Sequence, residues 1–559
     1  MKFPEMPYSR PNVDEVKAKL GELLEKFNNA KSVDEAVEVY RQFEEAYAKV
    51  YTNFSLAFIR NSLDTRDEFY DAEKNYSNEV APLLQEDVQK FSLALVNSKF
   101  RSELEAKWGK LMFVNTELAL KTFSPEIIEE LQEENKLGSE YDKLLASAQI
   151  EFDGKTLTLA QIKPYYENKD RKIREAAMRA TTDWWAKQTE RLDSLFDELV
   201  KVRSKKAKKL GYDSFTQLGY DQMTRNCYDK DMVKQFRDGV VKYIVPLVAK
   251  LKAEQAKRIG VDSIKIYDDA FEWPDGNAQP IGTPDDIFAH GKKMYHELSP
   301  DTKEFIDFML ENELFDVLTR PGKSGGGYCA TITEYKSPFI FANFNGTSGD
   351  IDVLTHEAGH AYAAYVGRDI FPRDLQEYTY EVAEIHSMSM EFLTWPWMEG
   401  FFGEKTSQYY YSHLASALIF LPYGCMVDEF QHIIYEKPEL TPAERNKIWL
   451  ELEGKYRPYL DIKDFPFYGE GRRWQAQAHI YERPFYYIDY CLAQIMALNF
   501  WAKSQEDFKD ALAKYRELVA YGGKKTFVEL IESVGLPSPF VASNIEIISS
   551  AALNWLNAQ

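Results

Sequence analysis

Hydrophobic residues recur at helical spacing along most of the chain, so the sequence predicts a mainly helical protein. The stretch "SVDE", from Ser32 to Glu35, is a capping box, and the segment behind it runs to about residue 62 without proline or glycine. "TPDD" at 283 and "TPAE" at 441 mark two further helix starts, each with proline in the first helical position. "SPEIIEELQEEN", from Ser124, predicts another helix.

Strand patterns are few and lie in the middle of the chain. "QIEFDGKTLTL" (149–159) places Asp153-Gly154 between alternating residues and predicts a short hairpin. "SIKIYD" (263–268) predicts one strand, and "YCATITEYKSPFIFANFNG" (328–346) predicts two strands around "YKSP". The preceding "PGKSGGG" (321–327) is not a phosphate-binding loop, because it lacks GxxxxGK[ST], and we interpret it as a flexible turn.

The composition is that of a large globular protein. The chain has 559 residues, of which 45% are hydrophobic, so a large core needs no disulfide or metal to hold it. A formal net charge of −21 argues against a nucleic-acid partner, whose phosphates bind lysine and arginine. The N-terminus lacks an apolar signal segment, no run of 18 apolar residues occurs, and the four cysteines are scattered. We therefore expect a cytoplasmic protein without a membrane span.

The helix after the predicted sheet carries the most informative motif, "VLTHEAGHAY" (353–362). His356 and His360 are four residues apart, so both imidazoles project from one helical face with room for one ion between them. Glu357 is rotated off that axis, where it can act on water instead of ligating the ion. Two buried imidazoles that share a face are the structural alternative. A catalytic zinc site would require a third protein ligand elsewhere in the chain.

A second predicted helix, "YEVAEIHSMSMEFL" (380–393), offers that ligand. Glu384 is embedded among apolar residues, which poorly suits a solvated surface charge, although a helix salt bridge is the alternative. A metzincin pattern is excluded because Ala363 and Val366 stand where it needs glycine and histidine. Glu384 is therefore the predicted third ligand. His386 points in a different direction, and we expect it to pack in the core or to support a ligand.

"HEAGH" followed by "VAEIHSMSMEFL", with "SPFIFANFNGT" just upstream, resembles the M3 family of zinc oligopeptidases, and within it the oligoendopeptidase F branch. The resemblance covers residues 200–559 firmly and the N-terminal helices loosely. It implies one zinc ion per chain, with His356, His360 and Glu384 as ligands and Glu357 as general base. It also implies that Glu391 orients a ligating imidazole.

The resemblance also implies an architecture and a substrate class. The family fold is a helical, two-lobed clam with the metal deep in a channel that admits short, unfolded peptides. We accordingly expect an N-terminal helical lobe at residues 1–195 and a catalytic zinc-peptidase region at 196–559.

"HIYERPFYYIDYCLAQ" (479–494) combines a histidine with tyrosines 8 and 11 residues later. An aromatic core helix is the structural alternative. The segment resembles the one that supplies transition-state donors in this family and in the related angiotensin-converting enzymes. By this resemblance His479 and Tyr490 donate hydrogen bonds to the oxyanion, and Tyr487 holds a substrate carbonyl. Tyr486 remains an alternative to Tyr487, because the spacing from His479 departs by one residue.

The predicted function is that of a zinc metalloendopeptidase that cleaves internal bonds of short oligopeptides. Peptide main chain is expected to add as a strand to an edge near residues 337–343, in contact with Phe341, Ala342 and Asn343. A carboxypeptidase or dipeptidase of the same clan is an alternative and needs a fixed cationic group for the terminal carboxylate. A non-catalytic peptide-binding protein is the third hypothesis, and the intact site residues argue against it.

Overall fold

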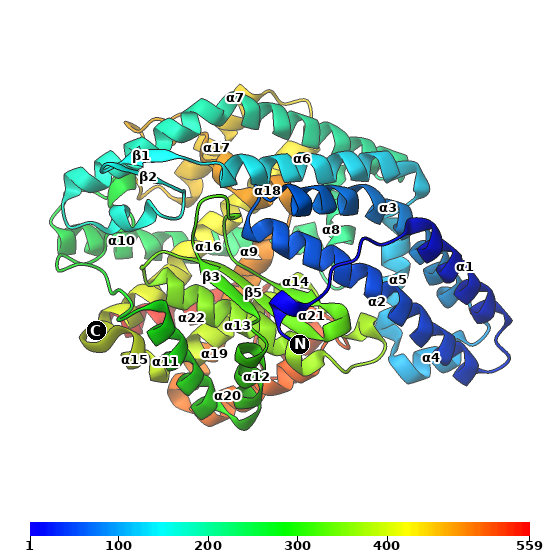
Figure 1. Ribbon diagram of the computed structural model, residues 1–559. Helices are drawn as coiled ribbons and strands as arrows, with labels where there is room; N and C mark the ends of the chain where they lie inside the picture. Colours follow the sequence, from blue (N-terminus) through cyan, green and yellow to red (C-terminus); the bar gives the residue numbers. More distant parts are fainter.

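Helices make up most of the structure, a computed structural model that describes all residues from 1 to 559 (Figure 1). They are α1 (Val13–Asn29), α2 (Val33–Leu63), α3 (Glu68–Val96), α4 (Arg101–Trp108), α5 (Lys110–Lys121), α6 (Ile128–Ala146), α7 (Arg171–Lys209), α8 (Phe215–Gln222), α9 (Lys230–Gly239), α10 (Val245–Ile259), α11 (Pro284–Leu298), α12 (Pro300–Glu311), α13 (Gly349–Gly367), α14 (Tyr380–Leu393), α15 (Glu399–Phe402), α16 (Thr406–Glu436), α17 (Pro442–Tyr456), α18 (Ala478–Glu482), α19 (Tyr487–Glu506), α20 (Phe508–Ala520), α21 (Phe527–Ser533) and α22 (Ala542–Asn557). No helix has the length and apolar character needed to cross a membrane.

The predicted helix starts are confirmed by their caps. Thr283 and Thr441 each form a complete capping box, with Pro284 and Pro442 as the first residues of α11 and α17. The Ser32 hydroxyl accepts the amide of Glu35 at 3.2 Å, so α2 begins where predicted, although the Glu35 carboxylate accepts from the Lys31 amide instead of closing the box.

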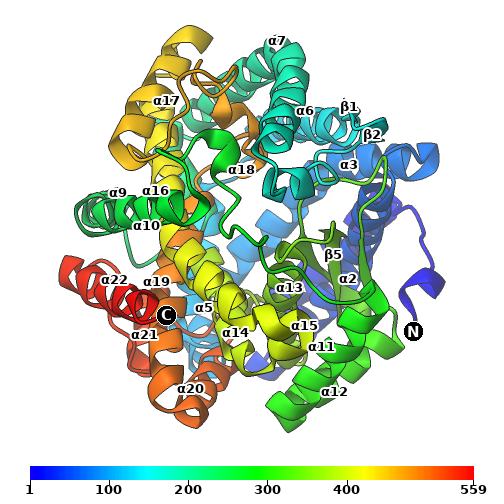
Figure 2. The ribbon, with the colours of Figure 1, turned by 90° about the vertical axis from the view of Figure 1, so that its left-hand side faces the viewer.

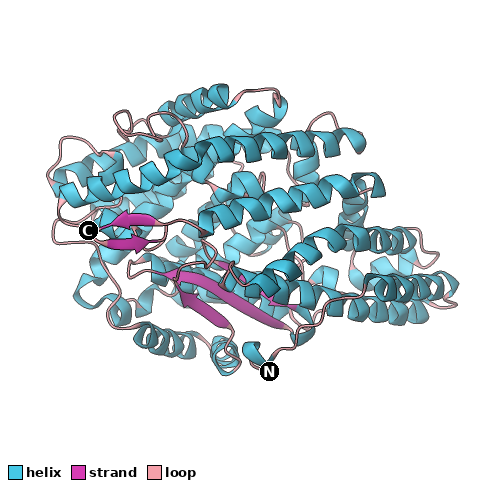
Figure 3. Cartoon of the chain, turned by 45° about the horizontal axis from the view of Figure 1, so that its top comes forward, coloured by secondary structure: helices cyan, strands magenta, loops and turns pink.

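Two small sheets lie among the helices (Figure 3). The predicted hairpin is confirmed as β1 (Ile150–Phe152) and β2 (Lys155–Leu157), joined by Asp153 and Gly154 with φ of 53° and 69°. The second sheet has the order β3-β5-β4, with β3 (Phe315–Leu318) parallel to β5 (Ser337–Phe344) and β4 (Tyr328–Ile332) antiparallel to it. The sequence predicted β4 and β5 but gave no sign of β3.

Two expectations about strands are wrong. Residues 263–268 form no strand: Lys265 makes a single bridge to Asp461, and a 3-10 turn follows at Ile266–Asp268. The expected free edge at residues 337–343 does not exist, because β5 is hydrogen-bonded to a strand on each side. The two outer edges of this sheet belong to β3 and β4.

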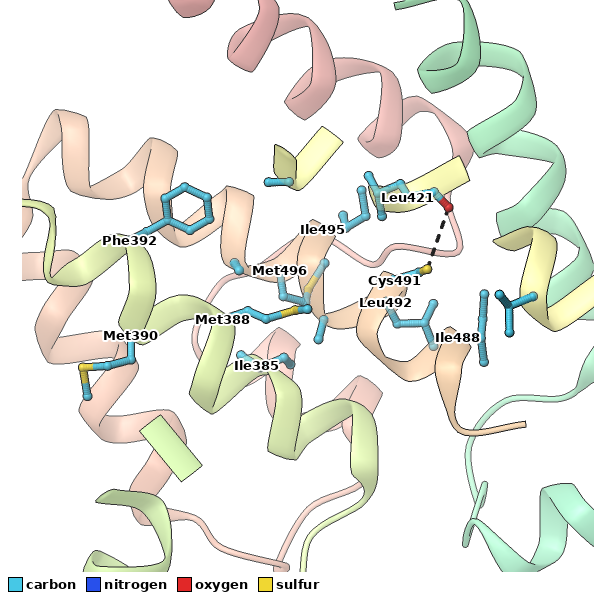
Figure 4. Close-up of a cluster of buried hydrophobic side chains, with 14 of the residues drawn as sticks. Ile385, Met388, Met390, Phe392, Leu421, Ile488, Cys491, Leu492, Ile495 and Met496 are labelled. Carbon is cyan, nitrogen blue, oxygen red and sulfur yellow. Dashed lines mark hydrogen bonds between the residues drawn. The ribbon is translucent and has the colours of Figure 1, made fainter. Parts of the chain in front are cut away.

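The core is continuous through most of the molecule. One cluster of 106 buried residues runs from Phe3 to Leu556, and α14, α16 and α19 contribute much of it (Figure 4). A second cluster of 16 residues joins the N-terminal helices α1 to α5. Residue 195 lies inside α7, which runs along one side of the molecule beside α6, opposite α12 and α20 (Figure 2). The division into lobes at residue 195 stays a prediction.

Candidate active site

Helices α13 and α14 bring the three predicted ligands together. His356 and His360 project from α13 and Glu384 from α14, and one donor atom of each lies within 4.8 Å of the others. Glu384 Oε2 is 3.2 Å from His356 Nε2 and 3.3 Å from His360 Nε2. Burial alone would raise the pKa of Glu384, but the two imidazoles hold it well below its usual range. Two imidazole nitrogens and one carboxylate are the donor set of a catalytic zinc site that keeps a position open for substrate.

A glycine sets the distance between these two helices. A Cβ atom at Gly359 would lie 2.6 Å from the backbone oxygen of His386 and 2.6 Å from Cα of Ser387. Only glycine allows α13 to approach α14 so closely, and this approach is what brings Glu384 within reach of both histidines. The glycine inside "HEAGH" is thus a structural requirement of the site that the ligand spacing alone does not reveal.

Glu357 lies beside the ligands with a free carboxylate oxygen. The residue is 5% exposed, and its Oε2 is buried without a hydrogen-bond partner. Burial raises the pKa of Glu357, and the neighbouring histidines oppose that shift. A Cβ atom at Gly327 would lie 3.2 Å from Glu357 Oε1. The glycine-rich turn, expected to be only a flexible connection, therefore borders the carboxylate of Glu357, and its three consecutive glycines are exposed.

A chain of hydrogen bonds fixes the tautomer of His356. Trp395 Nε1 donates to His413 Nδ1 at 2.9 Å, so that nitrogen must carry a lone pair, because an indole only donates. His413 Nε2–H then donates to Glu391 Oε2 at 2.9 Å, and His356 Nδ1–H donates to Glu391 Oε1 at 2.7 Å. The Nε2 lone pair of His356 is left facing the ligand cluster. Glu391 lies where the resemblance placed it, whereas Trp395 and His413 had no sequence signal.

The histidine and tyrosines of residues 479–490 gather on the other side of Glu384. His479 Nε2 lies 3.2 Å from the Tyr490 hydroxyl. Gln477 Nε2 donates to His479 Nδ1 at 2.9 Å, while its Oε1 accepts from the Tyr423 hydroxyl at 2.8 Å. Burial lowers the pKa of His479 to about 4, so a neutral imidazole carries its proton on Nε2. Burial also raises the pKa of Tyr490 well above its usual range, which keeps it a phenol.

Tyr486 and Tyr487 have different surroundings. The Tyr486 hydroxyl donates to Glu384 Oε1, the oxygen on the far side from the histidines. The Tyr487 ring packs 4.9 Å from His479 and 5.9 Å from Tyr423, between ring centres, and its hydroxyl makes no hydrogen bond within the protein. Tyr487 is therefore the one with a hydroxyl free for a ligand.

Two buried arginines hold this aromatic segment in place. Arg203, on α7, donates to the backbone oxygens of Ile480 and Tyr481, just after His479. Arg225 donates to the backbone oxygen of Phe485 at 2.5 Å and to Asp489 Oδ1 at 2.9 Å. Neither arginine had a sequence signal, because each lies more than 200 residues from the segment it holds.

The remaining predicted residues are packed or hydrogen-bonded within the protein. Phe341 and Ala342 are fully buried in the central strand, and Asn343 donates to the backbone oxygens of Ser324 and Gly326, both at 2.9 Å. Asn343 therefore holds the glycine-rich turn. His386 is buried against Tyr378, with ring centres 4.6 Å apart, and is not part of the ligand cluster.

Comparison with known proteins identifies the family. Residues 3–123 match the profile of the Peptidase M3 N-terminal domain, and residues 165–275 and 291–548 match that of Peptidase family M3. The oligopeptidase PepF of Bacillus subtilis (strain 168) is 23% identical over 581 residues, which covers 95% of this chain and 81% of that protein.

Solved structures agree along the whole chain. "PZ peptidase A with inhibitor 2" is 47% identical, with a TM-score of 0.98 and coverage of 100% of this chain and 99% of that one. A candidate oligoendopeptidase F is 46% identical, with the same TM-score and coverage. Oligoendopeptidase F from Enterococcus faecium, at 16% identity, a TM-score of 0.61 and 98% coverage of both chains, shares the fold. The chain is therefore a metallopeptidase that belongs to peptidase family M3 and to its oligoendopeptidase F branch.

Proposed function

We propose that this protein is a zinc-dependent endopeptidase that hydrolyses internal bonds of short oligopeptides in the cytoplasm. The observation that carries the proposal is the cluster of His356, His360 and Glu384 beside the unpartnered carboxylate of Glu357. These three residues fit zinc in the chemistry of their donors and in their mutual distances, and Glu391 orients one of them. Zinc bound there would supply Lewis acidity toward the scissile carbonyl and the attacking water.

Glu357 is the proposed general base. Its Oε2 lacks a protein partner, so it is free to accept a proton from water as the water attacks the peptide carbonyl. The same carboxyl then gives that proton to the leaving amine. Burial raises the pKa of Glu357, which favours both acceptance and release near neutral pH.

Tyr490 and His479 are the proposed donors to the carbonyl oxygen as negative charge develops on it. Their side chains are 3.2 Å apart at the donor atoms, and both are neutral, so two hydrogen bonds can converge on one oxygen. Removal of one such donor typically costs about 3 kcal/mol of transition-state stabilisation. Tyr487, with its free hydroxyl, is the proposed contact to a neighbouring substrate carbonyl.

The substrate main chain is proposed to lie along the β4 edge and the glycines before it. β4 is paired on one side only, and Gly327, directly before β4, adjoins Glu357. Pairing with a strand edge binds the peptide backbone with little demand on side chains, which suits an enzyme for many short peptides.

Two measurements test this function. Metal analysis of the purified protein should find one zinc per chain, and mass spectrometry of a mixed peptide library should find internal cuts. The variant Glu357→Gln should keep its zinc and lose nearly all hydrolysis, because the amide cannot accept the proton. Trimming confined to peptide ends would favour a carboxypeptidase or dipeptidase, and zinc binding without turnover would favour a non-catalytic binder.

A further inference from the structure

Exposed aromatic side chains are few in this protein, and two of them pack directly against residues of the candidate active site. The exposed ones are Tyr51, Phe58, Phe69 and Tyr380. Phe58, on α2, packs against Tyr328 of β4, with ring centres 5.2 Å apart. Tyr380, the first residue of α14, packs against Tyr486, which bonds to Glu384. A single exposed ring is ordinary on a protein surface, so the question is what these rings face.

The two faces of the sheet decide where the side chains of a peptide at the β4 edge would point. A Cβ atom at Gly327 points toward α13, where it would lie 3.2 Å from Glu357 Oε1 and 3.2 Å from Val353 Cγ1. Side chains alternate along an extended chain, and the ring of the next residue, Tyr328, meets Phe58 of α2 instead. A peptide strand paired with β4 alternates in the same way, so every second side chain of the peptide would face α2.

Helix α2 runs beside β4 in the opposite direction (Figures 1 and 2). Phe58 packs at the first residue of the strand, and Thr52 Oγ1 accepts the amide of Glu334, two residues past the last, at 2.8 Å. The end of α2 also holds the glycine-rich turn, because the Ser324 amide donates to the backbone oxygen of Ser62 at 2.9 Å. These contacts fix α2 as a wall beside the place proposed for the substrate main chain.

One face of α2 carries two exposed rings with a small residue between them. Tyr51, Ser55 and Phe58 follow at intervals of four and three residues, so they share a helical face. Tyr51 is 52% exposed and Phe58 is 40% exposed. Seven residues of helix separate these two residues by about 10.5 Å. An aromatic ring that contacts two others at the usual centre-to-centre distances needs about 9–14 Å between them. The face therefore has room for one aromatic side chain over Ser55.

Groups from the other side of the site contribute to the surroundings of Tyr51. Desolvation raises the pKa of Tyr51, and Glu377 and Tyr380 add to this rise, while Arg483 opposes it. Tyr380 is the residue whose ring lies 4.8 Å from that of Tyr486, so it belongs to the candidate site by direct contact. The exposed face of α2 is thus directed toward the segments that carry the proposed catalytic groups.

We propose that Tyr51, Ser55 and Phe58 form a subsite for an aromatic side chain of the peptide substrate. This inference rests on the proposed peptidase function and adds a substrate class to it. Binding there removes apolar surface of the peptide and of both rings from water, and ring pairs add a further contribution. Gly327 borders Glu357, and Phe58 stands one strand residue further along, so the preferred residue lies within about three residues of the scissile bond.

Matched peptide pairs test the subsite. Each pair differs only in phenylalanine against alanine at one position, and the pairs together scan three residues on each side of one scissile bond. Mass spectrometry confirms that both members are cut at the same bond. For the zinc-loaded wild type, kcat/KM should be about tenfold higher for the phenylalanine member at one position, mainly through KM, because the contact is made in the bound substrate as well as in the transition state.

Three variants should lower that ratio to about threefold or less. Tyr51→Ala and Phe58→Ala each remove one ring, and Ser55→Leu fills the gap while it keeps both rings. Because Phe58 also packs on β4, the variants at Tyr51 and Ser55 are the decisive ones. Phe69→Ala is the matched control and should keep the ratio, since Phe69 is an exposed ring of α3 that packs against Tyr8 and Tyr70. A ratio compares two substrates on one protein, so a general loss of activity cancels.

Equal kcat/KM within every pair for the wild type would overturn the subsite, as would an undiminished ratio in both Tyr51→Ala and Ser55→Leu. Titration of zinc-loaded Glu357→Gln with the same peptides separates this inference from the proposed function. Tighter binding of the phenylalanine member by a protein whose wild type cleaves neither peptide would retain the subsite and reject the peptidase. Cleavage without preference at any position would retain the peptidase and reject the subsite.

Discussion

At the scale of single residues, a chain of hydrogen bonds lies behind His356, one of the proposed zinc ligands. Glu391 is held in place by His413, and His413 by the indole of Trp395. Each link fixes the position of the next proton, so the lone pair of His356 would already face the proposed zinc site before zinc binds. Preorganisation of this kind commonly changes metal affinity by about 10- to 100-fold.

We predict that Trp395→Phe lowers zinc affinity about tenfold, because His413 is then free to change tautomer and Glu391 loses its fixed partner. Competition with a chromophoric chelator measures the affinity. Trp397→Phe is the matched control: its indole donates to exposed Glu297, away from the ligands. Equal zinc affinities of the two variants would contradict the role assigned to Trp395.

Gln477 contacts the proposed catalytic donor His479, and we expect it to act on catalysis through that contact. We predict that Gln477→Met lowers kcat between about 10- and 100-fold with little change in KM, because His479 no longer holds its proton on Nε2 alone. Steady-state kinetics on one peptide measures both constants, and zinc content should stay that of the wild type. A rise in KM at unchanged kcat would show that Gln477 serves substrate binding instead.

Candidate site residues could be predicted from the sequence where their spacing along a single helix places them together. His356, His360 and Glu357 follow from a helical period, and Glu384 from an acid in an apolar helix. The sequence could not predict the roles of Trp395, His413, Arg203 and Arg225. Their hydrogen bonds join elements that become neighbours only in the folded protein.

At the scale of elements, the site depends on how closely α13 and α14 cross. We predict that Gly359→Ala lowers the free energy of unfolding by about 1–3 kcal/mol, as overpacking does, and reduces zinc content, because Glu384 moves away from the histidines. Urea unfolding and metal analysis measure the two effects. Gly367→Ala in the same helix is the control, since its nearest neighbour, Ile370, would be 3.9 Å away. Full zinc content in Gly359→Ala would contradict this account.

Helices and turns could be predicted where their terminal residues have a known structural preference. Proline and threonine at 283 and 441 mark helix starts, and Asp153-Gly154 marks the hairpin. Residues 263–268 misled because Ile264 and Ile266 do alternate inward, at 2% and 6% exposure, yet they pack in a small core of their own without a strand to pair with. The central position of β5 in its sheet could not be predicted from the sequence. It requires pairing with β3, which begins more than 20 residues earlier and has only four residues.

At the scale of the whole molecule, buried neutral histidines tie stability to pH. Burial lowers the pKa of His432 from 6.5 to about 4, against the attraction of Asp428, while Arg237 adds to the shift. Its Nε2 lies 3.0 Å from the Tyr220 hydroxyl. The unfolded chain binds a proton at this residue below about pH 6.5 and the folded protein only below about pH 4, so acid favours unfolding between those values.

We predict that protonation of His432 lowers the free energy of unfolding of the wild type by about 3 kcal/mol as pH falls from about 6.5 to about 4. The free energy of unfolding of His432→Gln should fall correspondingly less over this range. Urea unfolding at several pH values gives the slope for each protein. The comparison concerns slopes, so a constant difference in stability does not affect it. Identical slopes would show that His432 is not neutral in the folded protein.

The two-lobe division also belongs to this scale and stays a prediction. One core takes residues from both sides of residue 195, and a smaller one joins α1–α5 but also includes Leu375. Composition predicted a large core correctly, but not how it is shared among segments, because that follows from tertiary contacts alone.

The three proposed zinc ligands lie within 29 consecutive residues, on two helices that pack against each other, whereas His479 and Tyr490 follow about a hundred residues later. A nascent chain leaves the ribosome in that order, and contacts close in sequence form first. If the proposed roles hold, a growing polypeptide could bind zinc before His479 and Tyr490 have been synthesised. The metal site would then be complete before the rest of the proposed catalytic groups.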